Sequence, residues 1–384
     1  MNILQTISSF GIKSGGTTSS TYDLLSALNK EGCQTEILTL LSPLPNDITI
    51  GNGEKWIHCL PNDAKTPFAF SKNLKNFLAY KNNYDIYHTN GLWMYCNHIT
   101  AKTAKKRNKP FVITTHGMLY PQALARSRWK KELMLRLFFN KEIHCADCIH
   151  ATCKTELEHI RNFGYKGVVA VVPNPVSINE VTNSISPQTK NPKQIGFLGR
   201  IHEIKNIDRI IYAWAKLDPR IIENAELLIA GSGDAAYENE LRNIVRQLNL
   251  KNVRFIGFIE GRKKYDFLNN LSALFVPSDT ENFGMIVAEA LLMRTPVMAS
   301  VYTPWEELNT HRCGWWVDND IDTIKNKMQE ALCLSDADYQ SMGNNGRKLI
   351  EEKYSDTIVA AMMKQLYTWI LNGKKAAENP PFVY

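Results

Sequence analysis

Short apolar runs alternate with longer amphipathic stretches along the whole chain. The runs are rich in β-branched side chains and end in polar or glycine-containing turns, as buried strands do. The strands predicted in the first half are Asn2–Ser8, Gln34–Leu40, Ile86–Thr89, Pro110–Thr115, Asp147–Ala151 and Val168–Val172. Those predicted in the second half are Gln194–Leu198, Ala225–Ala230, Val253–Ile256, Ala273–Val276 and Thr295–Ala299.

Helical periodicity occupies the intervals between these strands, as in Thr21–Lys30, Ser71–Tyr80 and Ile207–Lys216. Strand–helix alternation over this length predicts the α/β class, with parallel sheets covered on both faces. The polar segment Ser177–Lys193 contains two prolines and is the best candidate for a linker. We therefore expect two Rossmann-like domains facing each other across a cleft, one over residues 1–180 and one over residues 190–364. In such sheets, ligands bind at the carboxyl ends of the strands.

The composition agrees with a two-domain globular protein. The chain has 384 residues, of which 44% are hydrophobic and 22% charged, and this excludes an intrinsically disordered protein. Apolar runs stay well short of the ~18 residues that a membrane-spanning helix needs. The first residues, MNILQTI, lack a basic segment before an apolar stretch, so we expect no signal peptide. Eight cysteines are too sparse for a disulfide scaffold, and a cytoplasmic protein is the expectation.

Positive charge is concentrated in one region of the first half. The net charge is +7, and ten basic residues but one acid, Glu132, lie between Lys102 and Arg136. Within this region Trp129, Leu133 and Leu137 have helical spacing, which leaves two interpretations open. The stretch is either a basic amphipathic helix on an anionic membrane surface or a helix whose apolar side packs on its own domain. We find no nucleic-acid-binding motif and expect no nucleic-acid partner.

Two glycine-rich loops follow predicted strands. The first, FGIKSGG, ends in Gly15 and Gly16 and leads into a helix, where the backbone can approach an anion closely. It is not G-x-G-x-x-G, which disfavours a dinucleotide-dependent dehydrogenase. The second, AGSGD, contains Gly231 and is a candidate close-approach loop. A sharp turn with no ligand remains the alternative for both loops.

Two permanent cations follow the first strand of the second half. In IGFLGRIHEIKN the strand ends at Gly199, and Arg200 and Lys205 follow it. An arginine can hold two phosphate oxygens and a lysine adds a point charge, so the pair suits a diphosphate leaving group. An exposed loop without a ligand is the alternative.

Two glutamates flank a predicted helix start in VPSDTENFGMIVAEAL. Glu281 precedes the helix and Glu289 lies inside it, and both are suited to accept hydrogen bonds from sugar or ribose hydroxyls. The backbone amides of Phe283, Gly284 and Met285 would point at an anion, aided by the helix dipole. An N-terminal acid and a solvated helix residue are the alternative for the two glutamates taken singly.

In combination, Arg200 and Lys205 followed by Glu281 and Glu289 resemble the motifs of the retaining GT-B glycosyltransferases of glycosyltransferase family four. The resemblance covers nearly the whole chain, and Thr303–Val317 resembles a subgroup associated with cell-surface polysaccharide assembly. It implies that Arg200 and Lys205 hold the donor diphosphate, that Glu281 contacts the transferred sugar and that Glu289 binds ribose.

The same resemblance implies further donor contacts. Phe283, Gly284 and Met285 would offer amides to phosphate and sugar, the strand ending at Phe258 would read the base, and the loop after Ala230 would line the cleft at Gly231. In the first domain, the Gly15–Gly16 loop would close over the diphosphate, and His116 in TTHGM would contact the sugar or align the acceptor. Relatives often carry a histidine where Asn90 stands, so Asn90 is a candidate for acceptor choice.

The implied reaction moves a sugar from a nucleoside-diphosphate sugar to a hydroxyl of a glycan or polyprenyl-linked acceptor, with retention. The resemblance also implies that the leaving phosphate itself accepts the acceptor's proton, so we nominate no general base. We expect no metal or other cofactor. The segment Ser355–Leu371 is apolar at helical spacing and should return to the first domain, with a C-terminal helix at about residues 365–384 packed on it. A nucleotide-sugar epimerase or hydrolase and a non-catalytic nucleotide-sugar-binding protein are the competing functions.

Two segments mimic metal sites. His144–Cys153 contains a single Cys145-x-x-Cys148, which is weak support for zinc without a second pair, and Cys148 also suits a core strand. Asp318-Asn319-Asp320 imitates the D-x-D of metal-dependent glycosyltransferases, and we interpret it as a solvated loop.

Overall fold

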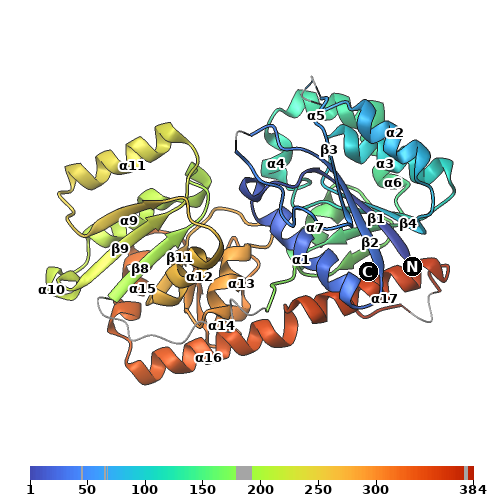
Figure 1. The fold of residues 1–384 in the computed structure, drawn as a ribbon. Coiled ribbons are helices and arrows are strands. Elements are labelled where there is room, and N and C mark those ends of the chain that lie inside the picture. Colours follow the sequence, from blue (N-terminus) through green and yellow to red (C-terminus); the bar gives the residue numbers. More distant parts are fainter. Residues whose placement is uncertain (45, 65, 67, 179–192, 376–378) are drawn as a thin grey trace. The chain divides into compact units, whose positions relative to one another are not determined.

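The computed structural model describes residues 1–44, 46–64, 66, 68–178, 193–375 and 379–384. The chain divides into two compact units (Figure 1). Unit 1 comprises Met1–Pro175 and Asp356–Tyr384, and unit 2 comprises Val176–Ser355. The C-terminal return to unit 1 thus begins at Asp356, in agreement with the apolar helical pattern of Ser355–Leu371 and earlier than residue 365. The expected linker, Ser177–Lys193, falls mostly outside the described residues.

Unit 1 contains a parallel sheet of seven strands in the order β3-β2-β1-β4-β5-β6-β7. The strands are β1 (Asn2–Ser9), β2 (Gln34–Leu40), β3 (Ile57–Leu60), β4 (Ile86–Asn90), β5 (Phe111–Thr114), β6 (Cys148–Ala151) and β7 (Val169–Val171). The helices are α1 (Gly16–Lys30), α2 (Lys72–Tyr80), α3 (Tyr95–Lys106), α4 (Pro121–Ala125), α5 (Arg128–Met134), α6 (Asn140–His144), α7 (Lys154–Asn162) and α17 (Asp356–Leu371).

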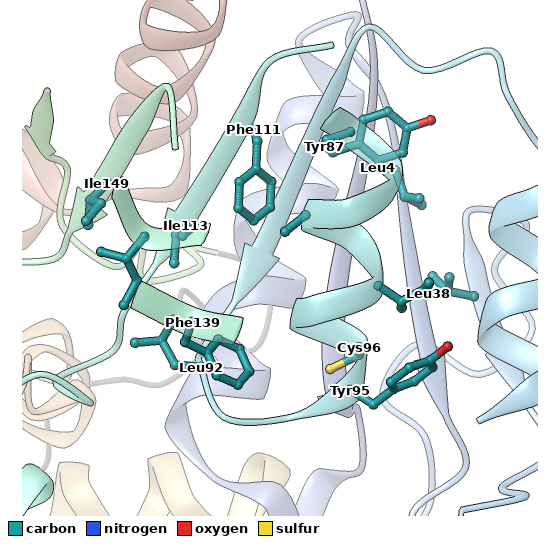
Figure 2. Close-up of a cluster of buried hydrophobic side chains, with 14 of the residues drawn as sticks. Leu4, Leu38, Tyr87, Leu92, Tyr95, Cys96, Phe111, Ile113, Phe139 and Ile149 are labelled. Carbon is teal, nitrogen blue, oxygen red and sulfur yellow. The ribbon is translucent and has the colours of Figure 1, made fainter. Parts of the chain in front are cut away.

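Alternate residues of these strands enter two different cores, because successive side chains in a strand point to opposite faces. On one face Tyr87, Phe111 and Ile149 join a cluster with α3 and Phe139, as Figure 2 shows. On the other face the neighbouring strand residues pack against α1 and α17, which contact each other. Both faces are apolar because both are covered, as a parallel sheet requires.

Unit 2 repeats this architecture with a parallel sheet of six strands in the order β10-β9-β8-β11-β12-β13. The strands are β8 (Lys193–Leu198), β9 (Ala225–Ala230), β10 (Val253–Gly257), β11 (Ala273–Val276), β12 (Val297–Ser300) and β13 (Gly314–Val317). The helices are α9 (Ile207–Ala215), α10 (Pro219–Ile222), α11 (Ala235–Gln247), α12 (Gly261–Asn270), α13 (Met285–Leu292), α14 (Glu307–Thr310), α15 (Ile321–Cys333) and α16 (Asp336–Lys353).

The sheet of unit 2 is also covered on both faces, except at its edge strand β10, where Arg254 and Ile256 are exposed. One face packs on α9, α11 and α15, and the other on α12, α13 and α16. Both units are therefore Rossmann-like, with parallel sheets covered by helices on two sides. The cleft between two such domains stays a prediction from the sequence.

Three elements differ from the sequence prediction. Strand β3 was not predicted, because its residues are only partly buried at the sheet edge and form no apolar run. Strand β13, Gly-Trp-Trp-Val, was not predicted either, because it is only four residues long and begins at a glycine, although its tryptophans and valine favour strands. Helix α1 begins at Gly16, earlier than the predicted start at Thr21. The prediction missed its first turn because the residues there are polar and show no apolar periodicity.

The basic stretch near residue 130 forms a broken helix. Helix α5 leads into a π-helical turn at Leu135–Phe139 and then into α6. Its inner side packs on the core through Phe139, whereas Trp129, Leu133 and Leu137 are 67%, 49% and 59% exposed. Met134, Leu135 and Phe138 also pack against this core, so the broken helix does pack on its own unit, although Trp129, Leu133 and Leu137 stay on its exposed side. Across the described residues, every helix is too short or too polar to cross a bilayer.

Candidate active site

The loops that follow β8, β9 and β10 are tied to one another by backbone contacts. Gly231 has a φ of 132°, and a Cβ there would lie 1.8 Å from the carbonyl oxygen of Gly199. The amide of Gly231 donates to the carbonyl of Gly257 at 2.8 Å, and Ile201 bridges to Gly233. Glycine at position 231 is thus required by the neighbouring loop, which rigidifies the carboxyl edge of the sheet.

Arg200 and Lys205 lie on the loop between β8 and α9, in different surroundings. Arg200 is exposed and makes no hydrogen bond or ion pair with any residue that the structure describes. Lys205 forms an ion pair with Glu281, and Ser278 donates a hydrogen bond of 2.9 Å to the same carboxylate oxygen. Two of the predicted site residues, Lys205 and Glu281, are therefore in direct contact, whereas Arg200, on the same loop as Lys205, is open to a ligand.

Two buried asparagines stabilise the loop that carries Glu281 by hydrogen bonds. Asn206 and Asn319 each donate to the carbonyl of Pro277 and to Asp279, at 2.7–3.0 Å. Arg209 in turn donates to the side chain of Asn319 at 2.7 Å. The interpretation of residues 318–320 as a solvated loop is wrong at Asn319, which is 6% exposed and holds the Glu281 loop in place.

Helix α13 begins after a left-handed residue, Gly284, with a φ of 79°. Phe283 is buried against Trp305 and Tyr354, and the indole of Trp305 donates to its carbonyl at 2.5 Å. None of the amides of Phe283, Gly284 and Met285 donates to an acceptor among the described residues. The aromatic packing thus fixes a helix N-terminus whose backbone donors are available to an anion.

Glu289 lies inside α13 and is 7% exposed. It forms an ion pair with Lys264 of α12 at 2.7 Å, a partner that sequence reasoning missed because nothing in the pattern of α12 distinguishes one lysine of its first turn from another. Phe258, just after β10, is 51% exposed and offers an aromatic face. These residues belong to the β10–α12 and β11–α13 connections of unit 2.

In unit 1, the Gly15–Gly16 pair lies at the start of α1. Gly15 is the N-cap with a φ of 89°, and a side chain there would meet open space. The preceding Gly11 is the close approach in this loop, because Asp47 occupies the position of its Cβ. Asp47 also accepts a hydrogen bond of 2.9 Å from the amide of Lys13.

His116 follows β5 in a left-handed conformation, with a φ of 47°. This strain for a non-glycine residue is compatible with a site that needs a fixed side-chain direction. Its Nε2 lies 3.1 Å from Oδ1 of Asn90, so the structure brings these two predicted residues together. Burial lowers the pKa of His116 to about 3, which keeps the imidazole neutral.

A buried carboxylate that sequence reasoning missed holds the His116 loop. Glu156 of α7 is 0% exposed and accepts hydrogen bonds from Thr115, Thr152 and the amide of Gly117, at 2.5–2.9 Å. A charged residue in a helix carries no sequence signal for such a role. These bonds fix the backbone on both sides of His116.

The cysteine cluster does not assemble a metal site. Cys148 is buried in β6, Cys145 is exposed and all eight cysteines are free. His150 points its ring at Thr114 and at the carbonyl of Val172. Over the ranges that the structure describes, no three His, Cys, Asp or Glu side chains converge as metal ligands do.

Chemically, unit 2 offers cations, carboxylates and free amides at the carboxyl edge of its sheet. An exposed guanidinium, a lysine and a helix N-terminus are suited to a diphosphate, while carboxylates accept hydrogen bonds from hydroxyls. Unit 1 offers a neutral, oriented imidazole. The set in unit 2 by itself fits a phosphorylated sugar compound better than a peptide or a nucleic acid.

Two family models match the chain, one in each unit. The model described as "Glycosyltransferase Family 4" matches residues 14–180, and the model "Glycosyl transferases group 1" matches residues 180–349. The two matches together extend over most of the chain.

Curated relatives match mainly one half of the chain. An uncharacterised glycosyltransferase of Methanocaldococcus jannaschii is 32% identical over 179 residues, or 46% of this chain and 44% of the relative. The capsular polysaccharide biosynthesis glycosyltransferase CapM of Staphylococcus aureus is 26% identical over 46% of each chain. The chain thus spans less than half the length of these first curated relatives.

Solved structures match over nearly the full length. Sucrose-phosphate synthase from Thermosynechococcus elongatus has a TM-score of 0.77 at 21% identity, covering 97% of this chain and 99% of that one. The Anabaena protein HepE in complex with UDP-glucose has a TM-score of 0.71 at 15% identity, covering 96% and 99%. At these identities the likeness shows the fold.

Proposed function

We propose that this chain, which belongs to glycosyltransferase family 4 and has the GT-B fold, transfers a sugar from a nucleoside-diphosphate donor to a hydroxyl of a glycan acceptor. One observation carries the proposal. The carboxyl edge of the unit 2 sheet gathers an exposed Arg200, the Lys205–Glu281 pair and the uncapped N-terminus of α13. That combination suits a diphosphate that bears a sugar.

The donor would lie along this edge. Arg200 and Lys205 would bind the diphosphate together with the amides of Phe283, Gly284 and Met285. Glu281, freed from Lys205 when phosphate takes its place, would accept hydrogen bonds from the sugar, and Glu289 would do the same for ribose. The base would lie against the β10 end near Phe258. Gly231 would keep the adjoining loop close enough for these groups to act on one ligand.

Transfer would proceed with retention at the anomeric carbon. The bond from that carbon to the diphosphate oxygen breaks, and the bond to the acceptor oxygen forms on the same face of the sugar. The acceptor proton passes to the leaving phosphate oxygen, so no protein base is needed. Arg200 and Lys205 stabilise the negative charge that grows on the diphosphate, and the protein acts by positioning and electrostatics. We propose that neither a metal nor another cofactor takes part.

In unit 1, His116 would contact the sugar or the acceptor, with Gly15 and Gly16 against the diphosphate and Asn90 near the acceptor. The solved HepE complex holds UDP-glucose, which supports a uridine donor. The name of CapM, a capsular polysaccharide biosynthesis glycosyltransferase, supports an acceptor in cell-surface polysaccharide assembly. We propose a glycan, free or polyprenyl-linked, as that acceptor.

The experiment uses purified protein with a panel of nucleoside-diphosphate sugars and glycan or polyprenyl-linked acceptors, with the anomeric product identified by proton NMR. We expect one donor to be consumed with retention. Glu281→Ala should abolish transfer but spare nucleotide affinity, whereas Glu289→Ala should weaken nucleotide binding about tenfold or more, because it removes charge-assisted hydrogen bonds. Equal loss of nucleotide affinity in both variants would contradict these roles. Interconversion of donors without transfer would point to an epimerase.

We further propose that α5 binds an anionic membrane surface on the cytoplasmic face, where lipid-linked acceptors are presented. Trp129, Leu133 and Leu137 form one exposed line along the broken helix, a larger apolar exposure than a packed surface helix leaves. Exposed basic side chains surround the line, among them Arg126, Arg128, Lys130 and Arg136. The charge complements anionic lipid, and the aromatic ring suits the headgroup region.

Flotation with vesicles containing anionic lipid tests the membrane proposal. We expect the wild-type chain to float at low salt, and the triple variant W129S/L133S/L137S to remain in solution. Tyr80→Ser is the matched control, because Tyr80 is 86% exposed in the same unit but lies at the end of α2. Wild-type protein that fails to float at low salt would overturn the proposal.

A further inference from the structure

A row of polar side chains crosses the otherwise apolar face of the unit 1 sheet that α17 covers. Gln5 of β1 is in register with His88 of β4, and Thr114 of β5 is in register with His150 of β6. All four are buried, and their strand neighbours on this face are residues such as Ile3, Ile86 and Cys148. Burying polar groups in such a core is costly unless each is hydrogen-bonded.

The row forms one continuous chain of hydrogen bonds with Tyr367 of α17 at its centre. From His150 the chain runs through Thr114 (2.8 Å), His88 (2.6 Å) and the Tyr367 hydroxyl (2.6 Å). It continues through Gln5 (3.1 Å), Asn90 (2.7 Å) and His116 (3.1 Å). At the opposite end, His150 Nε2 lies 2.7 Å from the carbonyl of Val172. The chain therefore links a backbone carbonyl beside β7 to the histidine of the candidate active site.

The direction of every bond follows from the end at Val172. A carbonyl only accepts, so His150 carries its proton on Nε2, and its Nδ1 accepts from the Thr114 hydroxyl. Burial lowers the pKa of His150 to about 4, so the ring is neutral and cannot donate from both nitrogens. Thr114 has then used its proton and must accept from Nε2 of His88.

The same reasoning passes through Tyr367 to the other half of the chain. Burial and the neighbouring histidines hold the pKa of His88 well below its usual range, so its Nδ1 accepts from the Tyr367 hydroxyl. Burial raises the pKa of Tyr367, which keeps this proton on the phenol. Tyr367 then accepts from the Gln5 amide, whose oxygen accepts from the Asn90 amide.

The last link determines the tautomer of His116. The Asn90 nitrogen is directed at Gln5, so its oxygen Oδ1 faces His116 and must accept. His116 therefore donates from Nε2. Its Nδ1 has no hydrogen-bond partner in the part of the chain that the structure describes, and it is not sealed from solvent.

We propose that the series of hydrogen bonds from Val172 to Asn90 fixes His116 as the Nε2–H tautomer, so that its Nδ1 accepts a hydrogen bond from a ligand hydroxyl. The positioning residues are then Tyr367, Gln5 and Asn90. Because Tyr367 belongs to α17, this helix links the donor directions of the His150–His88 half to those of the Gln5–His116 half. The ligand part rests on the proposed function, but the tautomer does not. A group that can only accept, such as a carboxylate, would be disfavoured opposite Nδ1.

The tautomer is read directly by long-range ¹H–¹⁵N correlation spectra of the full chain labelled at histidine. His116 is assigned by comparison with His116→Gln. We expect His116, His88 and His150 each to show a protonated Nε2 and an unprotonated Nδ1. Tyr367→Phe removes the hydroxyl that orders the Gln5 amide, so Gln5 and Asn90 can turn over and His116 should no longer be a single tautomer. Tyr84→Phe is the matched control. Tyr84 is also buried, and its hydroxyl donates to Glu36, which takes no part in this series of hydrogen bonds.

A wild-type His116 protonated at Nδ1 would overturn the proposal, even if Tyr367→Phe failed to fold. An unchanged His116 spectrum in folded Tyr367→Phe would also overturn it. Saturation with whichever nucleoside-diphosphate sugar is active should shift Nδ1 and leave Nε2 in place. An unmoved Nδ1 in a complex that transfers sugar would refute the ligand part and leave the transferase proposal standing. A protein that shows the expected tautomer but transfers no sugar would refute the transferase proposal and leave the tautomer assignment standing.

Discussion

Two ion pairs join lysines to the two acidic residues that we propose for the donor site. Lys205 pairs with Glu281 and Lys264 with Glu289, and in each pair both side chains are largely buried. Such pairs hold carboxylates in place, although the desolvation they require offsets much of their stabilisation. A diphosphate would compete with Glu281 for Lys205, so donor binding and release of the carboxylate would be coupled. The position of this carboxylate depends in turn on Asn206 and Asn319 beneath its loop.

Asn319→Ala should disturb the donor site from a distance. It removes two hydrogen bonds to the Glu281 loop and leaves the Pro277 carbonyl and Asp279 short of a donor, which costs about 2 kcal/mol of stability. Nucleotide affinity, measured by calorimetry, should fall about tenfold as the loop loosens. The neighbouring Asp318→Ala is the control, since Asp318 is exposed and makes no hydrogen bond or ion pair with the described residues. Equal effects in the two variants would refute the role of Asn319.

Among the elements of unit 2, the loops that carry candidate site residues contact one another through their backbones. The connections after β8, β9 and β10 meet at Gly199, Gly231 and Gly257 through backbone contacts. A ligand site built on such loops is stiffer than one on free loops, which favours preorganised electrostatics. In unit 1 the equivalent role falls to Glu156, whose four hydrogen bonds hold the His116 loop.

Gly231→Ala should be much more damaging than Gly257→Ala. The first substitution drives a methyl group into the Gly199 carbonyl at 1.8 Å, and we expect it to cost more than about 2 kcal/mol and to weaken donor binding. The second has an unfavourable φ of 80° but open space, and should cost about 1 kcal/mol. Melting temperatures and nucleotide titrations of both variants test this. Similar losses in both variants would mean that the loops are not packed as described.

Elements with a strong periodic signal could be predicted from the sequence, and those defined by tertiary contacts could not. β2, β9 and β11 have the predicted bounds because their apolar runs are bounded by polar turns. β3 depends on pairing with β2 at an edge, which no local pattern reveals. The site residues Lys205 and Glu281 were predicted, and their contact was found. Glu156 and Asn319 were not, because a buried polar residue is recognised by its partners and its own sequence neighbours do not mark it.

At the scale of the whole molecule, the two units differ in how they respond to acid. Unit 1 keeps the half-buried His116 and the buried His150 as neutral rings, with pKa values of about 3 and about 4, and buries His88 with a pKa far below its usual range. An unfolded histidine titrates near 6.5. Between the folded and unfolded pKa values, the unfolded chain therefore binds more protons than the folded chain. The contribution of these histidines to the free energy of unfolding is present above about pH 6.5 and is lost as the pH falls.

Unit 1 should consequently weaken in mild acid before unit 2. For His116 and His150 together, the loss between pH 8 and pH 5 is on the order of 4 kcal/mol, at about 1.4 kcal/mol per pH unit for each group. Hydrogen exchange, corrected for its intrinsic pH dependence and followed by mass spectrometry, separates peptides of the two units. Protection should fall in β4, β5 and β6 and stay nearly constant in β8 and β9. An equal loss in both units would show that the buried histidines do not control acid stability.

The proposed function requires that the sheet edge of unit 2 bind a nucleoside diphosphate without a metal. Calorimetric titration of the full chain with UDP, GDP and ADP, each with Mg²⁺ and with a chelator, tests this requirement. We expect one of these nucleotides to bind with the same affinity in both conditions, and Arg200→Ala to weaken its binding about tenfold or more, because a charge-assisted contact is lost. Binding that requires Mg²⁺, or folded protein that binds none of the three, would contradict it.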